Sequence, residues 1–240
     1  MSIFTGQPSV FSGSPLTTNE AAPSHALGEK MFTPDGRAYR YVKVGALALV
    51  VGNVLQGIAE DTGEQGLTPV AADAGALTIT TSAITVTKDQ YAGGFVIVTV
   101  TPGLGYQYKI KSHPASTAAA CVITLEDPIQ VALTTTSRID LVPNIYSGVI
   151  QSLAATSDAI VGVAVCPITA LYYGWIQTNG VASVLADGAL AVGDSIFASD
   201  NLAGGAESGV NAATEALPYI GVAVTGVATG ECGAVKLCID

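Results

Sequence analysis

The stretch between residues 172 and 240 constrains the fold most, because it consists of short apolar runs separated by turn-forming residues. Asn179-Gly180 and Asp187-Gly188 lie between such runs, and both dipeptides favour hairpin turns because their residues tolerate positive φ. We expect strands over residues 172–177, 181–185, 189–197, 219–224 and 233–239. Strands this short must close a barrel or a sandwich to be stable. The stretch therefore predicts an antiparallel β module.

The preceding part of the chain follows the same pattern. Residues 37–44 alternate as a strand, and further strands are expected at intervals of about ten residues between Gly and Pro turns. These expected strands cover residues 77–80, 83–87, 95–100, 106–111 and 121–125. No segment keeps the 3.6-residue period of a helix. The predicted fold class is all-β: an antiparallel β-barrel or sandwich module with a second β insertion and an extended amino-terminal arm.

Changes in composition divide the chain into four parts. Residues 1–35 are rich in Ser, Thr, Pro and Gly and are expected to form an extended arm. Residues 36–60 hold the first strands, residues 66–140 a β-rich insertion, and residues 145–240 a β-barrel-like module. We assign residues 36–60 to the last module because 45–55 and 188–197 share a Gly-Ala-Leu-Ala start and a later Gly-Asn or Gly-Asp step. Chance similarity in a chain rich in Ala, Gly and Val is the alternative explanation.

Charge and hydropathy narrow the classes of partner. The chain is 49% hydrophobic and 12% charged, about half the charge of an ordinary soluble domain. So little charge favours a surface that a partner covers over that of a stable monomer. A net charge of −10 argues against direct binding to nucleic acid. The apolar run 44–55 is too short and too interrupted to cross a bilayer, and the first residues lack the features of a secretory signal.

Two groups of residues are candidate partner contacts. Large apolar residues spaced along the amino-terminal arm are expected to anchor it in a neighbouring subunit, although a disordered tail remains the alternative. These anchors are Ile3, Phe4, Val10, Phe11 and Leu16. One face of the strand at 37–44 is half basic and half aromatic, and it is either an ion-pairing contact patch or a solvated face. It comprises Arg37, Tyr39, Tyr41 and Lys43.

The sequence offers little that resembles an active site. His25 and His113 lie near no Ser or Cys motif that would form a nucleophile–base pair. Glu126 and Asp127 are adjacent in a turn, where side chains point apart, so we expect neither catalysis nor a metal site from them. We expect no catalytic residue, no cofactor and no enzyme activity.

The four cysteines, Cys121, Cys166, Cys232 and Cys238, match no zinc or redox spacing. Six extended residues hold Cys232 and Cys238 roughly 20 Å apart, too far for a disulfide. We therefore expect all four to be buried free thiols.

The carboxy-terminal pattern resembles the head decoration, or capsid cement, proteins of tailed bacteriophages. The resemblance is carried by residues 188–197, with a small residue, Gly, Asp and an apolar strand, by the Ile-Gly-Val-Ala strand within 219–224, and by the Ala-Thr-Gly turn and closing strand of 228–237. It implies a β-tulip-like fold and a homotrimer on the capsid exterior of the virion, made in the host cytoplasm. It also implies an arm that contacts the major capsid protein, and neither a cofactor nor catalysis.

Three other functions compete with this interpretation. A tail- or fibre-associated adhesion protein is the first alternative, but it should show trimeric repeats, and the chain has only the echo between 45–55 and 188–197. A polysaccharide-acting enzyme is a lesser alternative that would depend on Glu126 or Asp127. A major capsid subunit should contain a long helix, which the sequence does not predict.

Overall fold

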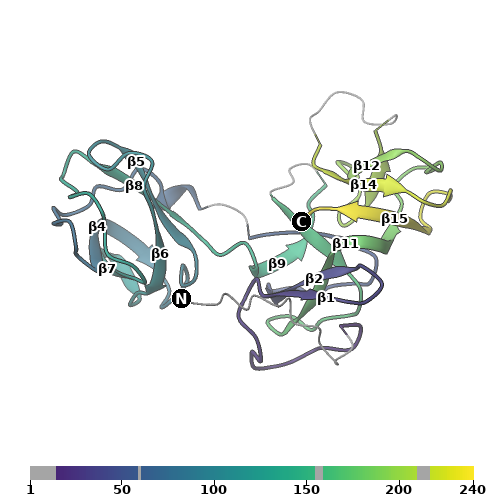
Figure 1. Cartoon of the computed structure of the whole chain (residues 1–240), viewed down its shortest axis with the longest axis horizontal. Coiled ribbons are helices and arrows are strands. Elements are labelled where there is room, and N and C mark those ends of the chain that lie inside the picture. Colours follow the sequence, from purple (N-terminus) through teal and green to yellow (C-terminus); the bar gives the residue numbers. More distant parts are fainter. Residues whose placement is uncertain (1–14, 59–60, 155–158, 210–216) are drawn as a thin grey trace, which may run out of the picture. The chain divides into compact units, whose positions relative to one another are not determined.

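The computed structural model describes residues 15–58, 61–154, 159–209 and 217–240. Contacts divide the chain into two compact units. Unit 1 combines the described residues up to Ile58 with those from Ile145 onwards, and unit 2 spans Ala59–Asn144. Figure 1 labels most of the strands of both units, all except β3, β10 and β13. The prediction of an all-β fold is confirmed, since the described residues contain fifteen strands and no α-helix.

Unit 1 is built on one ten-stranded sheet, whose order is β1-β2-β9-β3-β10-β11-β15-β14-β12-β13. All pairings are antiparallel except β2 with β9. The strands are β1 (Lys30–Phe32), β2 (Ala38–Val44), β3 (Val54–Gln56), β9 (Ser147–Gln151), β10 (Ile160–Ala164), β11 (Tyr173–Leu185), β12 (Ser195–Ala198), β13 (Ala206–Ser208), β14 (Tyr219–Ala223) and β15 (Cys232–Cys238).

Unit 2 holds a five-stranded antiparallel sheet of order β4-β7-β6-β5-β8. Its elements are the 3-10 turn η1 (Thr62–Glu64), β4 (Thr78–Val86), β5 (Phe95–Val100), β6 (Gln107–Ser112), β7 (Ser116–Leu125) and β8 (Arg138–Val142). The segment 67–72 closes the sheet into a barrel, because Leu67 bridges Ile139 of β8 while Val70 donates to the carbonyl of Thr80 in β4. The alternating apolar residues of these strands form one core, which includes Ile79, Val96, Ile110, Ile123 and Ile139.

Strand β11 runs unbroken through Asn179-Gly180, so the predicted hairpin at this dipeptide is wrong. Gly180 does take a positive φ of 83°, but it bends the strand instead of reversing it. The first half of β11 pairs with β2, the second half pairs with β15, and Asn179 faces both Ala38 and Cys238. Partners on both flanks thus keep β11 extended where local propensity favours a turn.

Four loops of unit 1 repeat one backbone pattern. In each loop a residue i forms an isolated β-bridge, and a turn follows it. In that turn the N–H of residue i+4 donates to the carbonyl of residue i+1. The turn bonds run from Asn53 to Val50, from Tyr172 to Thr169, from Asp194 to Ala191 and from Glu231 to Ala228. The loops associate in two pairs, through the bridges Leu49–Ile168 and Leu190–Val227. The echo seen in the sequence between 45–55 and 188–197 is therefore a real structural repeat, with two further copies that the sequence does not reveal.

The cysteines are free, as expected, but only Cys121 and Cys166 are buried. Burial raises the pKa of both of these thiols, which keeps them protonated and unreactive. Cys232 and Cys238 are exposed, so the prediction of four buried thiols is wrong for this pair. Alternation along β15 explains this, because Val235 and Leu237 turn inward and both cysteines share the outward face.

Candidate docking surface

Both histidines make structural contacts within their own unit. His113 is buried in unit 2, where its Nε2 accepts the N–H of Tyr91 at 3.0 Å and its Nδ1 lies 2.9 Å from the carbonyl of Pro114. His25 pairs with Glu29 at 3.2 Å and packs against the rings of Tyr41 and Trp175. The thiol of Cys121 lies 3.6 Å from the same Pro114 carbonyl, and burial raises the pKa of this thiol, so it is not an activated nucleophile.

In the acidic pair that follows β7, Glu126 contacts a lysine and Asp127 is exposed to solvent. Glu126 lies 3.1 Å from Lys109, and both side chains are more than two-fifths exposed. Among the residues that the structure describes, no three His, Cys, Asp or Glu side chains are grouped in positions to hold a metal. The geometry gives Glu126 a surface ion pair, a contact worth less than about 1 kcal/mol.

The prediction of an extended arm is wrong for residues 15–35, because the described chain packs on unit 1 from residue 15 onwards. Glu20 and Tyr173 exchange two backbone hydrogen bonds of 3.0 and 2.8 Å. Asn19 exchanges two more with Thr169, through its side chain. The anchors Ile3, Phe4, Val10 and Phe11 lie outside the described residues. Leu16, the fifth anchor, is 46% exposed on unit 1.

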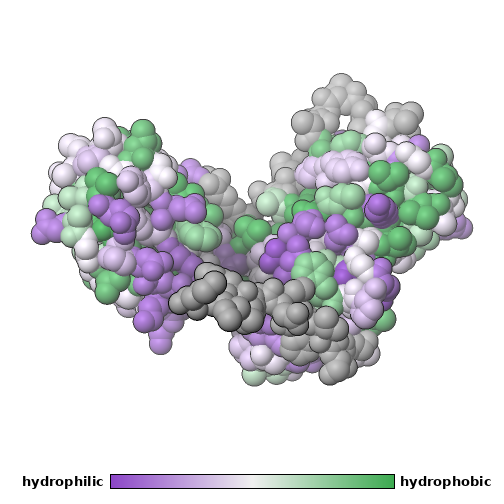
Figure 2. Space-filling view, in the orientation of Figure 1, coloured by the Kyte–Doolittle hydropathy of each residue, from purple (hydrophilic) through white to green (hydrophobic). Residues whose placement is uncertain are grey.

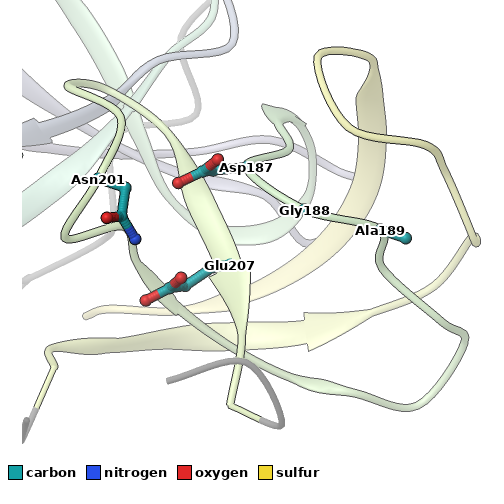
Figure 3. A pocket seen from close by; sticks show the side chains of 5 residues that line it. All are labelled: Asp187, Gly188, Ala189, Asn201 and Glu207. Atoms are coloured by element: carbon teal, nitrogen blue, oxygen red, sulfur yellow. The ribbon is translucent and has the colours of Figure 1, made fainter. Parts of the chain in front are cut away.

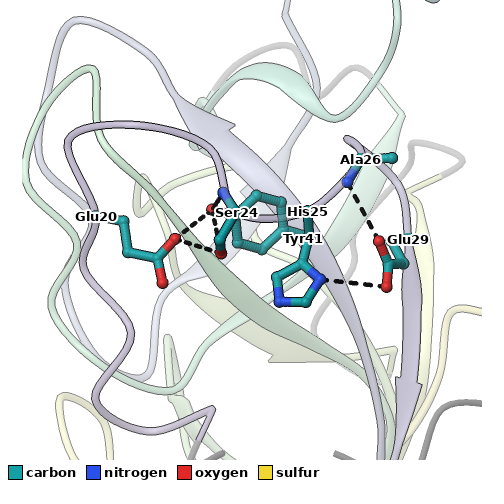
Figure 4. Close-up of polar contacts among 6 residues, drawn as sticks. All are labelled: Glu20, Ser24, His25, Ala26, Glu29 and Tyr41. Carbon is teal, nitrogen blue, oxygen red and sulfur yellow. Dashed lines mark hydrogen bonds and ion pairs between the residues drawn. The ribbon is translucent and has the colours of Figure 1, made fainter.

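Tyr39 and Tyr41 are not an exposed contact face, so this part of the predicted basic and aromatic patch is wrong. Both rings are fully buried, in a cluster with Met31 and Trp175. The segment 20–29 covers them: the hydroxyl of Tyr41 donates to Glu20 at 2.7 Å and accepts the N–H of Ser24 at 3.2 Å. Figure 4 shows the contacts of Tyr41 with Glu20 and Ser24. The sequence did not predict this burial because residues 20–29 belong to the segment that we expected to form an extended arm.

The basic residues of the predicted patch also make contacts within unit 1. Arg37 forms an ion pair with Asp35 at 2.7 Å and lies over the ring of Tyr39, and Lys43 lies over the ring of Tyr173. Each keeps a partly exposed side chain. A role of Arg37 and Lys43 in binding a partner stays a prediction.

A carboxy-terminal carboxylate neutralises the neighbouring basic residues. Asp240 contacts Arg40 at 2.6 Å and Lys30 at 3.3 Å. The hydrogen bond from Arg40 lowers the pKa of Asp240, and the charges of Arg40 and Lys30 lower it further. This triad joins β1 and β2 to the end of the chain, so these cations serve the fold of unit 1.

Several exposed apolar side chains lie on the first pair of repeated loops, residues 45–53 and 165–172. The loops are joined by the Leu49–Ile168 bridge and by a bond of 3.0 Å from the N–H of Leu171 to the carbonyl of Gly45. The Cys166 thiol lies 3.6 Å from the carbonyl of Pro15, which places the start of the described chain beside them. We call this surface the loop-tip patch; it comprises Leu16, Leu47, Val50, Val51 and Leu171, with exposed fractions of 46%, 69%, 58%, 45% and 61%.

Leu171 occupies a backbone position that favours glycine. Its φ is +66°, and the same turn position in the other three repeated loops is Gly52, Gly193 and Gly230, each with a φ between 81° and 89°. A leucine in this region costs about 1 kcal/mol relative to glycine. With 61% of its side chain exposed, Leu171 recovers little of that cost by burial in unit 1.

Figure 2 shows hydrophobic residues at the visible surface of both units. In the part of the chain that the structure describes, no helix is long and apolar enough to span a membrane. Comparison with protein-family models, curated proteins and solved structures gives no match. The resemblance to capsid decoration proteins accordingly stays a prediction from the sequence.

Proposed function

We propose that this protein is a structural virion protein that binds the outer surface of a phage capsid and stabilises the shell against internal pressure. Its partners in this role are the major capsid protein and further copies of itself in a homotrimer. The resemblance of residues 188–237 to decoration proteins motivates the proposal. The exposed apolar side chains of the loop-tip patch support it.

The observation that carries the proposal is the exposed leucine held in a strained turn. Leu171 has a φ of +66° and projects 61% of its side chain from the patch, where equivalent turns use glycine. A side chain that costs stability and gains little burial is expected where it contacts something outside the unit. We assign that contact to the capsid surface.

The architecture also suits attachment to a lattice. A cement protein must add contact area across subunits that internal pressure pushes apart, and each apolar contact contributes through the area it removes from water. Several weak contacts on one oligomer bind together far more tightly than each alone. The five exposed apolar side chains of the loop-tip patch supply apolar area for such a contact on each copy.

Replacing Leu171 separates docking from folding. We expect Leu171→Gly to keep or raise the melting temperature, because glycine relieves the positive φ, while binding to shells prepared without this protein falls about tenfold. Leu104→Ser removes a leucine of 63% exposure from unit 2 and serves as the matched control. Unchanged shell binding by Leu171→Gly would contradict the proposal.

Deletion of residues 1–14 tests the arm without disturbing Glu20 or Asn19, which hold the following segment on unit 1. We expect weaker shell binding with unaltered unfolding. Electron microscopy of labelled particles then gives the location: threefold clusters on the shell support the proposal, and label on the tail would instead favour the adhesion protein.

A further inference from the structure

A pocket of about 450 Å³ lies in unit 1. Asp187, Gly188, Ala189, Asn201 and Glu207 line it. Figure 3 shows the side chains of Asp187, Asn201 and Glu207 grouped around one space. All the charged groups lining this pocket are therefore acids.

A parallel bridge brings the two carboxylates together. Ala186 pairs with Ala206, and the N–H of Asp187 donates to the carbonyl of Ala206 at 2.7 Å. Asp187 and Glu207 each follow a bridged alanine by one residue, so their side chains leave the paired segments on the same side. Two like charges placed side by side in this way destabilise the fold unless a cation lies between them.

Glu207 is 4% exposed, and its Oε1 atom has no hydrogen-bond partner. Burial raises the pKa of this carboxyl, and the charges of Asp200 and Asp187 raise it further, outweighing a backbone hydrogen bond from Asp200. None of the ion pairs found among the described residues includes Asp187, Asp200 or Glu207. A buried carboxylate with an unsatisfied oxygen is costly, and a bound cation removes that cost.

A buried serine fixes the arrangement of the pocket. The hydroxyl of Ser199 donates to Oδ2 of Asp187 at 2.5 Å and accepts the N–H groups of Asn201 and Leu202, both at 3.0 Å. The amide nitrogen of Asn201 donates to the carboxylate of Asp200, which ties the side chain of Asn201 to the loop beside the pocket. Outer contacts of this kind orient the oxygen ligands of a metal.

We propose that this pocket binds Ca²⁺, with oxygen ligands from the carboxylates of Asp187 and Glu207 and with water completing the coordination. The pocket offers two acidic ligands, and the described residues contain no grouping of three acidic, His or Cys side chains. Calcium accepts six to eight oxygens in irregular geometry and tolerates this, whereas Mg²⁺ requires a near-ideal octahedron. The small number of charged ligands places the dissociation constant in the range of about 0.1–1 mM.

The test is calcium titration of the full chain after treatment with chelator. We expect 10 mM CaCl₂ to raise the melting temperature by about 3–6 °C, more than 10 mM MgCl₂ does. Glu207→Gln and Asp187→Asn should each lower calcium affinity at least tenfold in calorimetric titration. Glu126→Gln, which removes an acid from unit 2, should leave the calcium response intact.

Glu207→Gln also removes the burial penalty, so we expect it to be more stable than the parent chain without calcium. If that variant failed to fold, Asp187→Asn would carry the test alone. No calcium response in the parent chain would overturn the proposal, as would an undiminished response in both pocket variants. Equal shifts with Ca²⁺ and Mg²⁺ would overturn the assignment to calcium.

Discussion

Two tyrosines on β2 allow the contribution of the covering segment 20–29 to be measured. Tyr39 and Tyr41 are both fully buried, but only Tyr41 has hydrogen-bond partners for its hydroxyl, at 2.7 Å to Glu20 and 3.2 Å from Ser24. The hydroxyl of Tyr39 has no hydrogen-bond partner. Burial raises the pKa of Tyr39, and the nearby charge of Arg37 offsets part of that rise without a hydrogen bond of ordinary geometry to the hydroxyl. The variants Tyr41→Phe and Tyr39→Phe therefore remove the same atom, but only Tyr41→Phe removes hydrogen bonds with it.

We expect Tyr41→Phe to lower the free energy of unfolding by about 2 kcal/mol. A hydrogen bond to a charged group contributes about 1.5–3 kcal/mol and one to a backbone N–H about 1 kcal/mol. The lower end applies because Glu20 and Ser24 are partly open to water, which can replace the lost hydroxyl. Tyr39→Phe removes an unsatisfied buried hydroxyl, so it should be neutral or stabilise the chain by up to about 1 kcal/mol.

The assay is equilibrium unfolding in urea, at neutral and acidic pH. The hydrogen bond from Ser24, followed by that from Tyr41, lowers the pKa of Glu20 below its usual 4.5. A lowered carboxyl pKa stabilises the fold above the unfolded-state pKa, and that stability is lost as the pH falls through the folded-state pKa. The deficit of Tyr41→Phe should therefore shrink below about pH 4. Equal destabilisation by both variants at neutral pH would refute this description of the cluster.

The remaining predictions concern both units. Glu64→Gln should stabilise the chain at about pH 7.5 but not near pH 4. Burial, and then the charge of Asp61, raise the pKa of Glu64, and a carboxyl with a raised pKa costs stability as the pH rises. Urea unfolding at both pH values measures this difference. Gly221→Ala should lower the free energy of unfolding by about 3 kcal/mol, because the added Cβ would lie 2.1 Å from the carbonyl oxygen of Lys236. The control Gly226→Ala should cost much less, since the atom nearest to its added Cβ would be 3.3 Å away. Thermal unfolding measures both variants. Ile123→Ala should cost about 2–5 kcal/mol in the unit 2 core by calorimetry, and the exposed Val122→Ala less than about 0.5 kcal/mol.

The candidate sites show how far local sequence patterns extend. Exposed leucines and valines at 45–53 and 165–172 are visible in the sequence, but nothing local shows that these loops meet through Leu49 and Ile168. Leu171 is likewise an ordinary residue until its φ is known and compared with Gly52, Gly193 and Gly230. Asp187 and Glu207 are twenty residues apart, and their shared pocket depends on the bridge between Ala186 and Ala206.

Alternating apolar residues and Gly, Asn and Asp at turns determined the all-β class, and they did so because strand period and positive φ are local properties. The outward face of β15 and the turns at Gly52 and Gly193 follow from the same rules. Only the tertiary structure decided that β11 continues through Asn179-Gly180 and that Tyr39 and Tyr41 are buried in the core of unit 1. Those outcomes depend on which segments pair across long sequence separations, where the free energy of burying a shared surface exceeds the conformational preference of any single dipeptide.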